Sequence, residues 1–138
     1  MKDIKFRIWD KENKKMVNLG RIDIADGSCS PTIFGNIFYD YWNDVELMQY
    51  VGCKDKNNKE IYEGDIVTTK EHTGQIIYSK VNKVEGVIKM CNYSWCIVYK
   101  KDDMVCKHPL FMEEEFCNIN ELEVIGNIYE NPELIINK

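Results

Sequence analysis

Apolar and polar residues alternate in short runs along much of the chain, which is the pattern of β-strands rather than of helices. Ile4, Phe6 and Ile8 alternate with basic residues. A period of two is that of a half-buried strand, because successive side chains point to opposite faces. The polar run at residues 10–15 then leads into Met16-Val17. The pattern therefore predicts an opening hairpin.

The rest of the chain continues in this way, except that residues 20–30 are polar, contain Asp26-Gly27 and predict a loop or turn. The apolar runs are short, rich in β-branched and aromatic residues, and separated by glycine, asparagine or acidic residues. Such spacing is typical of a small barrel. Strands are expected at residues 33–41, 45–50, 66–70, 75–78, 84–90, 95–100 and 122–129, with a short helix as the alternative for residues 45–50.

The most informative segment is residues 47–67, LMQYVGCKDKNNKEIYEGDIV. Asn57-Asn58 stands between two apolar runs, as the turn of a polar hairpin would. Gly64-Asp65 predicts a sharp corner before a β-branched strand, and Gly86-Val87-Ile88 follows later in the chain. By analogy with known folds, such a glycine corner favours an SH3-like barrel in the C-terminal half.

Three blocks of the sequence together resemble the YopX family, a group of small phage and prophage proteins. They are IKFRIWDKENKKMV at residues 4–17, the segment 47–67, and LEVIGNIYENPEL at residues 122–134. Asn58 stands where the family usually has glycine, and Cys53 where it usually has an aliphatic residue. Because asparagine tolerates positive φ, the turn should survive. The resemblance implies a mostly-β phage protein and carries over no catalytic residue.

We therefore predict a mostly-β protein with minor helix, built from an N-terminal hairpin region and a small SH3-like barrel. One compact unit is expected over residues 1–138, or a subdivision into residues 1–62 and 63–138. At the end of the chain, Asn131 as N-cap and Pro132 at the first helical position predict a short helix. The residues that should form the structural signature of turns, corners and cap are Gly52, Asp55, Asn57, Asn58, Tyr62, Gly64, Asp65, Gly126, Asn131 and Pro132.

The charge of the chain argues against general affinity for nucleic acid. The net charge is −5, and capture of phosphate backbones needs clustered basic residues. The distribution is uneven, because residues 1–20 carry six basic and three acidic groups (net +3) and residues 102–138 carry two and nine (net −7). The acidic run Glu113-Glu114-Glu115 is interpreted as a solvated face in preference to a docking patch.

Candidate chemistry is sparse in this sequence. Cys91 and Cys96, followed by Cys106, His108 and Cys117, could supply zinc ligands, but the spacing matches no known pattern. Cys96 alternates within an apolar run, where free cysteine behaves as a small hydrophobe. No apolar export segment follows Met1, so reduced thiols are expected. We predict no metal, cofactor or catalytic residue.

Asp55 and Asn57 match the first and third positions of a calcium-binding loop. The rest of the pattern does not match, because Lys59, Glu60 and Ile66 occupy later ligand or glycine positions. His72 and His108 lie in charged segments outside any recognisable catalytic motif.

These observations favour a non-catalytic interaction module of a phage or prophage, in the cytoplasm of the bacterial host. The expected partner is a host or phage protein, without membrane association. The alternative is a nucleic-acid-associated accessory protein that uses the basic N-terminal half. A homo-oligomer is also expected, because Trp9 lies on the strand face opposite Ile4, Phe6 and Ile8, so the opening strand presents apolar residues on both faces.

Overall fold

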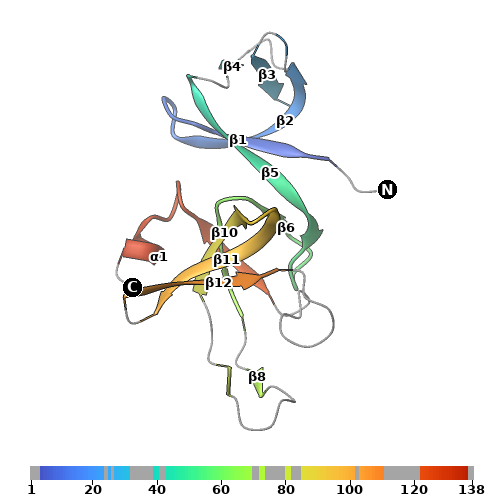
Figure 1. The fold of residues 1–138 in the computed structure, drawn as a ribbon. Coiled ribbons are helices and arrows are strands. Elements are labelled where there is room, and N and C mark those ends of the chain that lie inside the picture. The colour runs from blue at the N-terminus through green and yellow to red at the C-terminus, as the bar shows by residue number, and fades with distance from the viewer. Residues whose placement is uncertain are drawn as a thin grey trace. The chain divides into compact units, whose positions relative to one another are not determined.

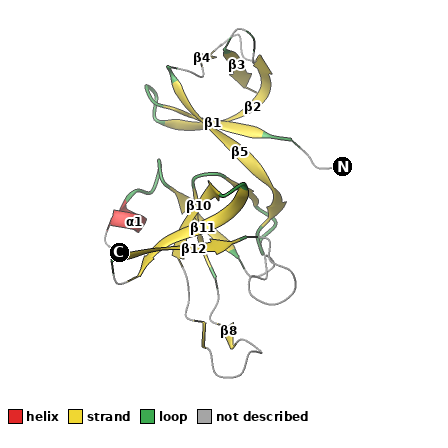
Figure 2. Cartoon of the chain, viewed as in Figure 1, coloured by secondary structure: helices red, strands yellow, loops and turns green. Residues whose placement is uncertain are grey.

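The structure, a computed structural model, is built almost entirely from antiparallel strands (Figures 1 and 2). It describes residues 4–23, 25, 27–31, 39–40, 43–69, 72–73, 80–81, 85–101, 103–110 and 122–136. The chain forms two compact units, Met1–Tyr50 and Val51–Lys138. The strands are β1 (Phe6–Asp10), β2 (Lys15–Asp23), β3 (Ser28–Pro31), β4 (Tyr39–Asp40), β5 (Val45–Lys54), β6 (Glu60–Tyr62), β7 (Asp65–Thr68), β8 (His72–Thr73), β9 (Lys80–Val81), β10 (Glu85–Cys91), β11 (Ser94–Lys101), β12 (Met104–Pro109) and β13 (Glu123–Asn127), and the helix is α1 (Glu133–Ile136).

The opening hairpin is confirmed: β1 pairs with β2, and Asp10 fixes the turn between them. The Asp10 carboxylate accepts hydrogen bonds from the backbone N–H groups of Glu12 and Asn13, both at 3.0 Å. β1 also pairs with β5, so it is a central strand of the order β4-β3-β2-β1-β5-β6. Because both edges of β1 are covered, Arg7 and Asp10 are buried with Ile8, and the strand is more enclosed than simple alternation predicts.

The prediction of a loop over residues 20–30 is wrong for most of that segment. β2 continues to Asp23 and pairs with β3, with Arg21 opposite Ser30. Polar residues can form this ladder because its hydrogen bonds come from the backbone. Gly27, at φ +78°, lies in the turn between the two strands. The core of the first unit is the buried cluster Ile8, Cys29 and Val45.

The strand expected at residues 45–50 is confirmed and is longer, since β5 runs to Lys54 and enters the second unit. The strand expected at residues 33–41 lies mostly outside the described residues, and that at residues 75–78 lies wholly outside them. In the second unit the polar hairpin joins β5 to β6, and the corner after Tyr62 leads into β7.

The second unit contains a five-stranded antiparallel sheet of order β12-β11-β10-β7-β13. One face carries Val67, Ile88 and Ile97, which form a buried cluster with Val51 of β5 and Ile61 of β6. Among the described strands, β12 and β13 each have one neighbour in this sheet, so it is open and the predicted closed barrel is not confirmed. β12 was not predicted, because its sequence MVCKHP has a short apolar start, no alternation and a proline at its end.

The short terminal helix is confirmed as α1. Within the described part of the chain, no helix has the length and apolar character needed to cross a membrane.

Candidate functional site

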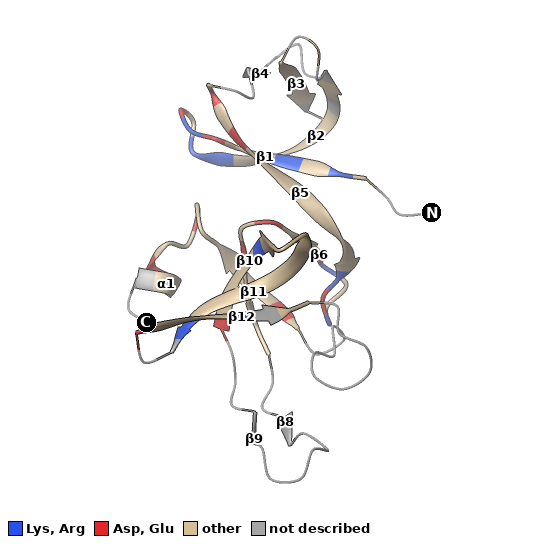
Figure 3. Cartoon of the chain, in the orientation of Figure 1, with Lys and Arg blue, Asp and Glu red and all other residues tan. Residues whose placement is uncertain are grey.

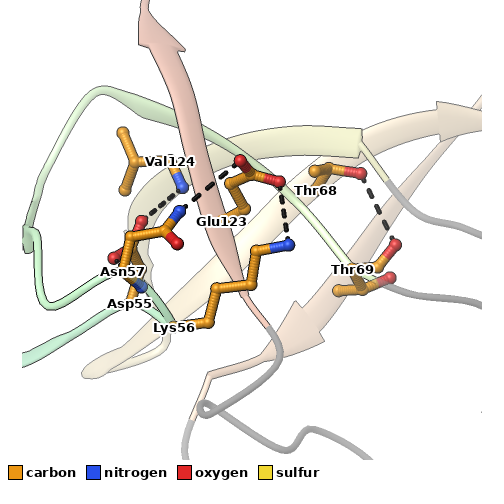
Figure 4. A network of polar contacts seen from close by, with 7 residues as sticks. All are labelled: Asp55, Lys56, Asn57, Thr68, Thr69, Glu123 and Val124. Carbon is orange, nitrogen blue, oxygen red and sulfur yellow. Dashed lines mark hydrogen bonds and ion pairs between the residues drawn. The ribbon is translucent and has the colours of Figure 1, made fainter.

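The polar hairpin between β5 and β6 is organised by one buried carboxylate (Figure 4). Asp55 is 6% exposed, and its Oδ1 accepts hydrogen bonds from the N–H groups of Asn57 and Lys59 at 2.8 and 2.9 Å. Its Oδ2 accepts from the N–H of Val124 on β13 at 2.9 Å. Both oxygens of the carboxylate are therefore engaged by the backbone, so the side chain that the calcium interpretation required serves as a turn and strand anchor.

The corner after β6 is also held by a buried aspartate whose carboxylate accepts a backbone hydrogen bond. Asp65 is almost fully buried, and its Oδ2 accepts a hydrogen bond from the N–H of Tyr62 at 2.8 Å. Gly64 has φ +83°, a left-handed conformation that favours glycine. The N–H of Gly64 donates to the carbonyl of Ile88, and its own carbonyl accepts from the N–H of Ile128. The corner thus ties β7 to β10 and to the segment after β13.

Two further signature residues also have left-handed backbones. Gly52 has φ +96° and Asn58 has φ +66°. Asn58 lies in the turn of the polar hairpin, where its N–H donates to the carbonyl of Asp55 at 3.0 Å. Asparagine is one of the residues that adopt this conformation at low cost.

Close approach of the Asn131 side chain explains the glycine at position 126. An added Cβ at Gly126 would lie 2.5 Å from Asn131 Oδ1. That oxygen accepts a hydrogen bond from the N–H of Asn127 at 3.2 Å, and the N–H of Asn131 donates to the carbonyl of Asn127. The carbonyl of Asn131 accepts from Leu134 at the start of α1, and Pro132 follows it. The Asn131 side chain thus fixes the turn before the helix rather than bonding a helical N–H.

A groove lies on the face of the five-stranded sheet that is opposite the buried cluster. It encloses about 480 Å³. Its floor is a row of apolar residues on three neighbouring strands, since Val87 on β10 is opposite both Ile66 on β7 and Val98 on β11. Leu134 and Ile135 of α1 also line the groove. The row reaches three strands because side chains at paired positions share one face of a sheet.

Charged residues border this apolar floor. Lys89 and Lys100, which are exposed, line the groove together with half-buried Glu85. Lys107 on β12 is exposed and is opposite Val98, so it lies on the same face. Figure 3 marks the basic and acidic residues along these strands. The four side chains carry three positive charges and one negative charge, a local sum of +2 in a chain whose net charge is −5.

The five described cysteines are all free thiols. Cys91 and Cys96 lie on one face of the β10–β11 hairpin, whereas Cys106 is opposite Tyr99 and therefore lies on the other face. The His108 side chain and Cys117 lie outside the described part of the structure, as does the His72 side chain. Across the residues that are described, no three His, Cys, Asp or Glu side chains gather as metal ligands.

Burial governs the ionisation of the thiols. Desolvation raises the pKa of Cys53 to about 11, and it also raises the pKa of Cys96, with a smaller contribution from neighbouring Cys91. A thiol with a raised pKa is a weak nucleophile and a weak metal ligand at neutral pH, because the thiolate is the reactive form.

Sequence reasoning missed the groove and the strand at one end of it. The signal available was the Val-x-Lys spacing of Val105 and Lys107, which repeats that of Val98 and Lys100 on the preceding strand. Leu134 and Ile135 could be assigned to a helix from the sequence. That they line a groove depends on where the turn held by Asn131 directs the chain.

The fold and these sites define a class of small proteins with two antiparallel β units, whose signature residues fix turns and strand connections. A family model described as YopX protein matches residues 5–136. The chain belongs to the YopX family.

The crystal structure of protein EF1440 from Enterococcus faecalis is similar over almost the whole chain. The two sequences are 25% identical, and the alignment covers 98% of this chain and 99% of that one with a TM-score of 0.52. None of the curated proteins compared with this chain is significantly similar to it.

Proposed function

We propose that this protein is a non-catalytic interaction module of a phage or prophage, which acts in the cytoplasm of the bacterial host and binds a protein partner through its second unit. The observation that carries the proposal is the groove of about 480 Å³ with its apolar floor and lysine border. Its volume lies in the range of small-molecule pockets, roughly 300 to 1,000 Å³. An apolar surface with a few polar groups around it is the usual composition of a recognition site.

The hydrogen bonds made by the buried aspartates support binding rather than catalysis. Asp10, Asp55 and Asp65 each accept hydrogen bonds from backbone N–H groups. Carboxylates held in this way stabilise turns and have few lone pairs left for a substrate. The raised pKa values of Cys53 and Cys96 further reduce the nucleophilicity of those thiols.

The strand order supports an SH3-like architecture for the second unit. In the order β12-β11-β10-β7-β13, the first strand of the sheet lies between the second strand and the last. SH3-like barrels have the same order, and many of them bind peptides. Closure of the sheet stays a prediction.

A site-specific cross-linking experiment tests the proposed function. The photoreactive residue p-benzoylphenylalanine is placed at Ile135, which lines the groove, or at Gln49, an exposed control position on β5. Tagged protein is purified from infected or lysogenic host cells after irradiation, and the cross-linked proteins are identified by mass spectrometry. We expect one host or phage protein to be cross-linked from Ile135 and absent from Gln49. Identical patterns from the two positions, or no product from Ile135, would contradict the proposal.

The second candidate is a nucleic-acid-associated accessory protein. It is favoured by Lys11, Lys14 and Lys15, which are all exposed on the β1–β2 hairpin, although Lys11 is paired with Glu46 at 3.2 Å. A gel-shift assay with duplex DNA and with RNA distinguishes the candidates. The interaction module should give no shift, whereas the accessory protein should give a shift that weakens with salt and with the double variant Lys14→Glu, Lys15→Glu.

Self-association is proposed as a further property of the first unit. Ile4, next to β1, is 78% exposed, and Trp9 of β1 is half-buried. Light scattering at micromolar concentration should give a mass above the 16.3 kDa monomer. Ile4→Glu should lower that mass without changing the melting temperature appreciably, and a monomeric parent protein would contradict self-association.

A further inference from the structure

The groove extends to an edge of the sheet that is unpaired among the described strands. Val105 lines the groove and belongs to β12, which pairs with β11 and with no other described strand. Met104 and Val105 are 69% and 59% exposed. Natural sheets usually protect an edge with charges, proline or a covering segment, since an open apolar edge invites another strand. In β12 the proline stands at the far end, at position 109, and the charge is Lys107, so the exposed apolar residues Met104 and Val105 lie at the other end of the strand.

The register of β12 shows which backbone groups point outward. The N–H of Leu110 donates to the carbonyl of Trp95 at 2.9 Å, so these two residues form a hydrogen-bonded pair. Hydrogen-bonded and non-bonded pairs alternate along an antiparallel ladder. The pairs Lys107–Val98 and Val105–Lys100 are therefore non-bonded. The N–H and carbonyl groups of Val105 and Lys107 consequently point away from β11, toward the edge that no described strand occupies.

The basic side chains near this edge favour an acidic partner segment. Lys100 and Lys107 lie on the groove face beside Val105, and Lys89 lies further along the same face. Glu85 is the acidic side chain of the groove lining, so with Lys89 and Lys100 the lining sums to +1, and Lys107 beside it on the same face brings the local sum to +2. Opposite charges on neighbouring strands attract and like charges repel, so an added strand with carboxylates on this face is favoured over one with amines.

We propose that β12 binds an extended, acidic segment of a partner protein by strand addition. The main chain of the segment pairs with the outward groups of Val105 and Lys107. An apolar side chain covers Val105 at the end of the groove, and a carboxylate lies opposite Lys107. Main-chain bonds supply affinity in this mode, and alternate side chains supply specificity. The inference rests on the proposed function and specifies the chemistry of the partner.

Two labelled synthetic peptides test the proposal by fluorescence anisotropy, one of alternating valine and glutamate and one of alternating valine and lysine. The acidic peptide should bind at least tenfold more tightly, and its affinity should fall as salt is raised. In amide hydrogen exchange, Val105 and Lys107 should become protected when it binds. Equal affinity of the two peptides, or no binding of the acidic peptide up to about 1 mM, would overturn the inference.

Two variants locate the binding edge. Val105→Pro removes an outward N–H and leaves the ladder with β11 intact, so acidic-peptide affinity should fall about tenfold, which is the loss of one hydrogen bond. Met104→Ala keeps every outward donor and should bind like the parent protein; both variants are checked for folding by circular dichroism. Unchanged binding by folded Val105→Pro contradicts the inference.

Two results would overturn the inference without touching the proposed function. One is a partner cross-linked at Ile135 that lacks an acidic extended segment. The other is a dimer that light scattering detects and that Val105→Pro abolishes, because a second copy of this chain would then occupy the edge of β12.

Discussion

The Asp55 carboxylate accepts a hydrogen bond from the backbone N–H of Val124, with Asp55 Oδ2 and Val124 N 2.9 Å apart. It also holds two N–H groups of its own turn. A single side chain thus shapes the polar hairpin and fastens it to β13, far away in the sequence. Backbone donors that lose their acceptor cost about 1–3 kcal/mol each when they stay buried. Position 55 should therefore matter more to stability than its hairpin location suggests.

Asp55→Ala should lower the free energy of unfolding by on the order of 2–4 kcal/mol, because three backbone donors lose their acceptor. Urea denaturation measures the change. The matched control is Glu123→Ala, which removes a partly exposed ion pair with Lys56 at 3.1 Å and should cost less than about 1 kcal/mol. Equal losses in the two variants would show that Asp55 contributes only as a surface charge.

Gly64→Val should cost on the order of 1–3 kcal/mol, since φ at position 64 is +83° and a β-branched residue is strained there. Asn58→Gly should be neutral or slightly stabilising, because glycine adopts the φ of +66° at position 58 without strain. Thermal unfolding of both variants provides the comparison. A Gly64→Val protein as stable as the parent would refute the role of the corner.

Gly126→Ala tests a steric constraint rather than a dihedral one. The new methyl group would meet Asn131 Oδ1 at 2.5 Å and displace the turn before α1, so a loss of about 1–3 kcal/mol is expected. At Gly52 an added Cβ meets nothing within 4 Å, so Gly52→Ala should cost only its backbone strain, about 1 kcal/mol. The double variant Gly126→Ala, Asn131→Ala should lose less stability than the two single variants added together, because the clashing side chain is gone. A loss equal to that sum would count against the clash.

The Cys53 thiol should react slowly with iodoacetamide in the folded protein. Burial raises its pKa to about 11, so at pH 8 about 0.1% of it is thiolate, against about 10% for an ordinary thiol of pKa 9.0. Peptide mass spectrometry after timed alkylation measures the rate, and the protein in urea serves as control. Rates that match in the two states would contradict the burial of Cys53.

The same shift links Cys53 to the pH dependence of stability. The folded state holds the thiol proton more tightly than the unfolded state, whose thiol has the ordinary pKa of 9.0. This contribution is complete below pH 9 and is lost as the pH rises through about 11. Cys53→Ala should therefore make the fall of the melting temperature between pH 9 and 11 less steep.

The sequence by itself determined the local features of this protein. The opening hairpin, the turn at Asn57-Asn58, the corner at Gly64 and the terminal helix follow from residues whose backbone preferences act over a few positions. The family could also be recognised from three short blocks of sequence. Each of these signals is local, because asparagine, glycine and proline limit φ wherever they stand.

Only the tertiary structure decided which strands are central, where the units divide and which residues line the groove. Alternation in β1 could not show that Arg7 and Asp10 are buried, because that depends on β2 and β5 covering both of its edges. The groove likewise needs Ile66, Val87 and Val98 side by side. Long-range pairing sets their register, and a one-residue slip would turn each of these side chains to the opposite face.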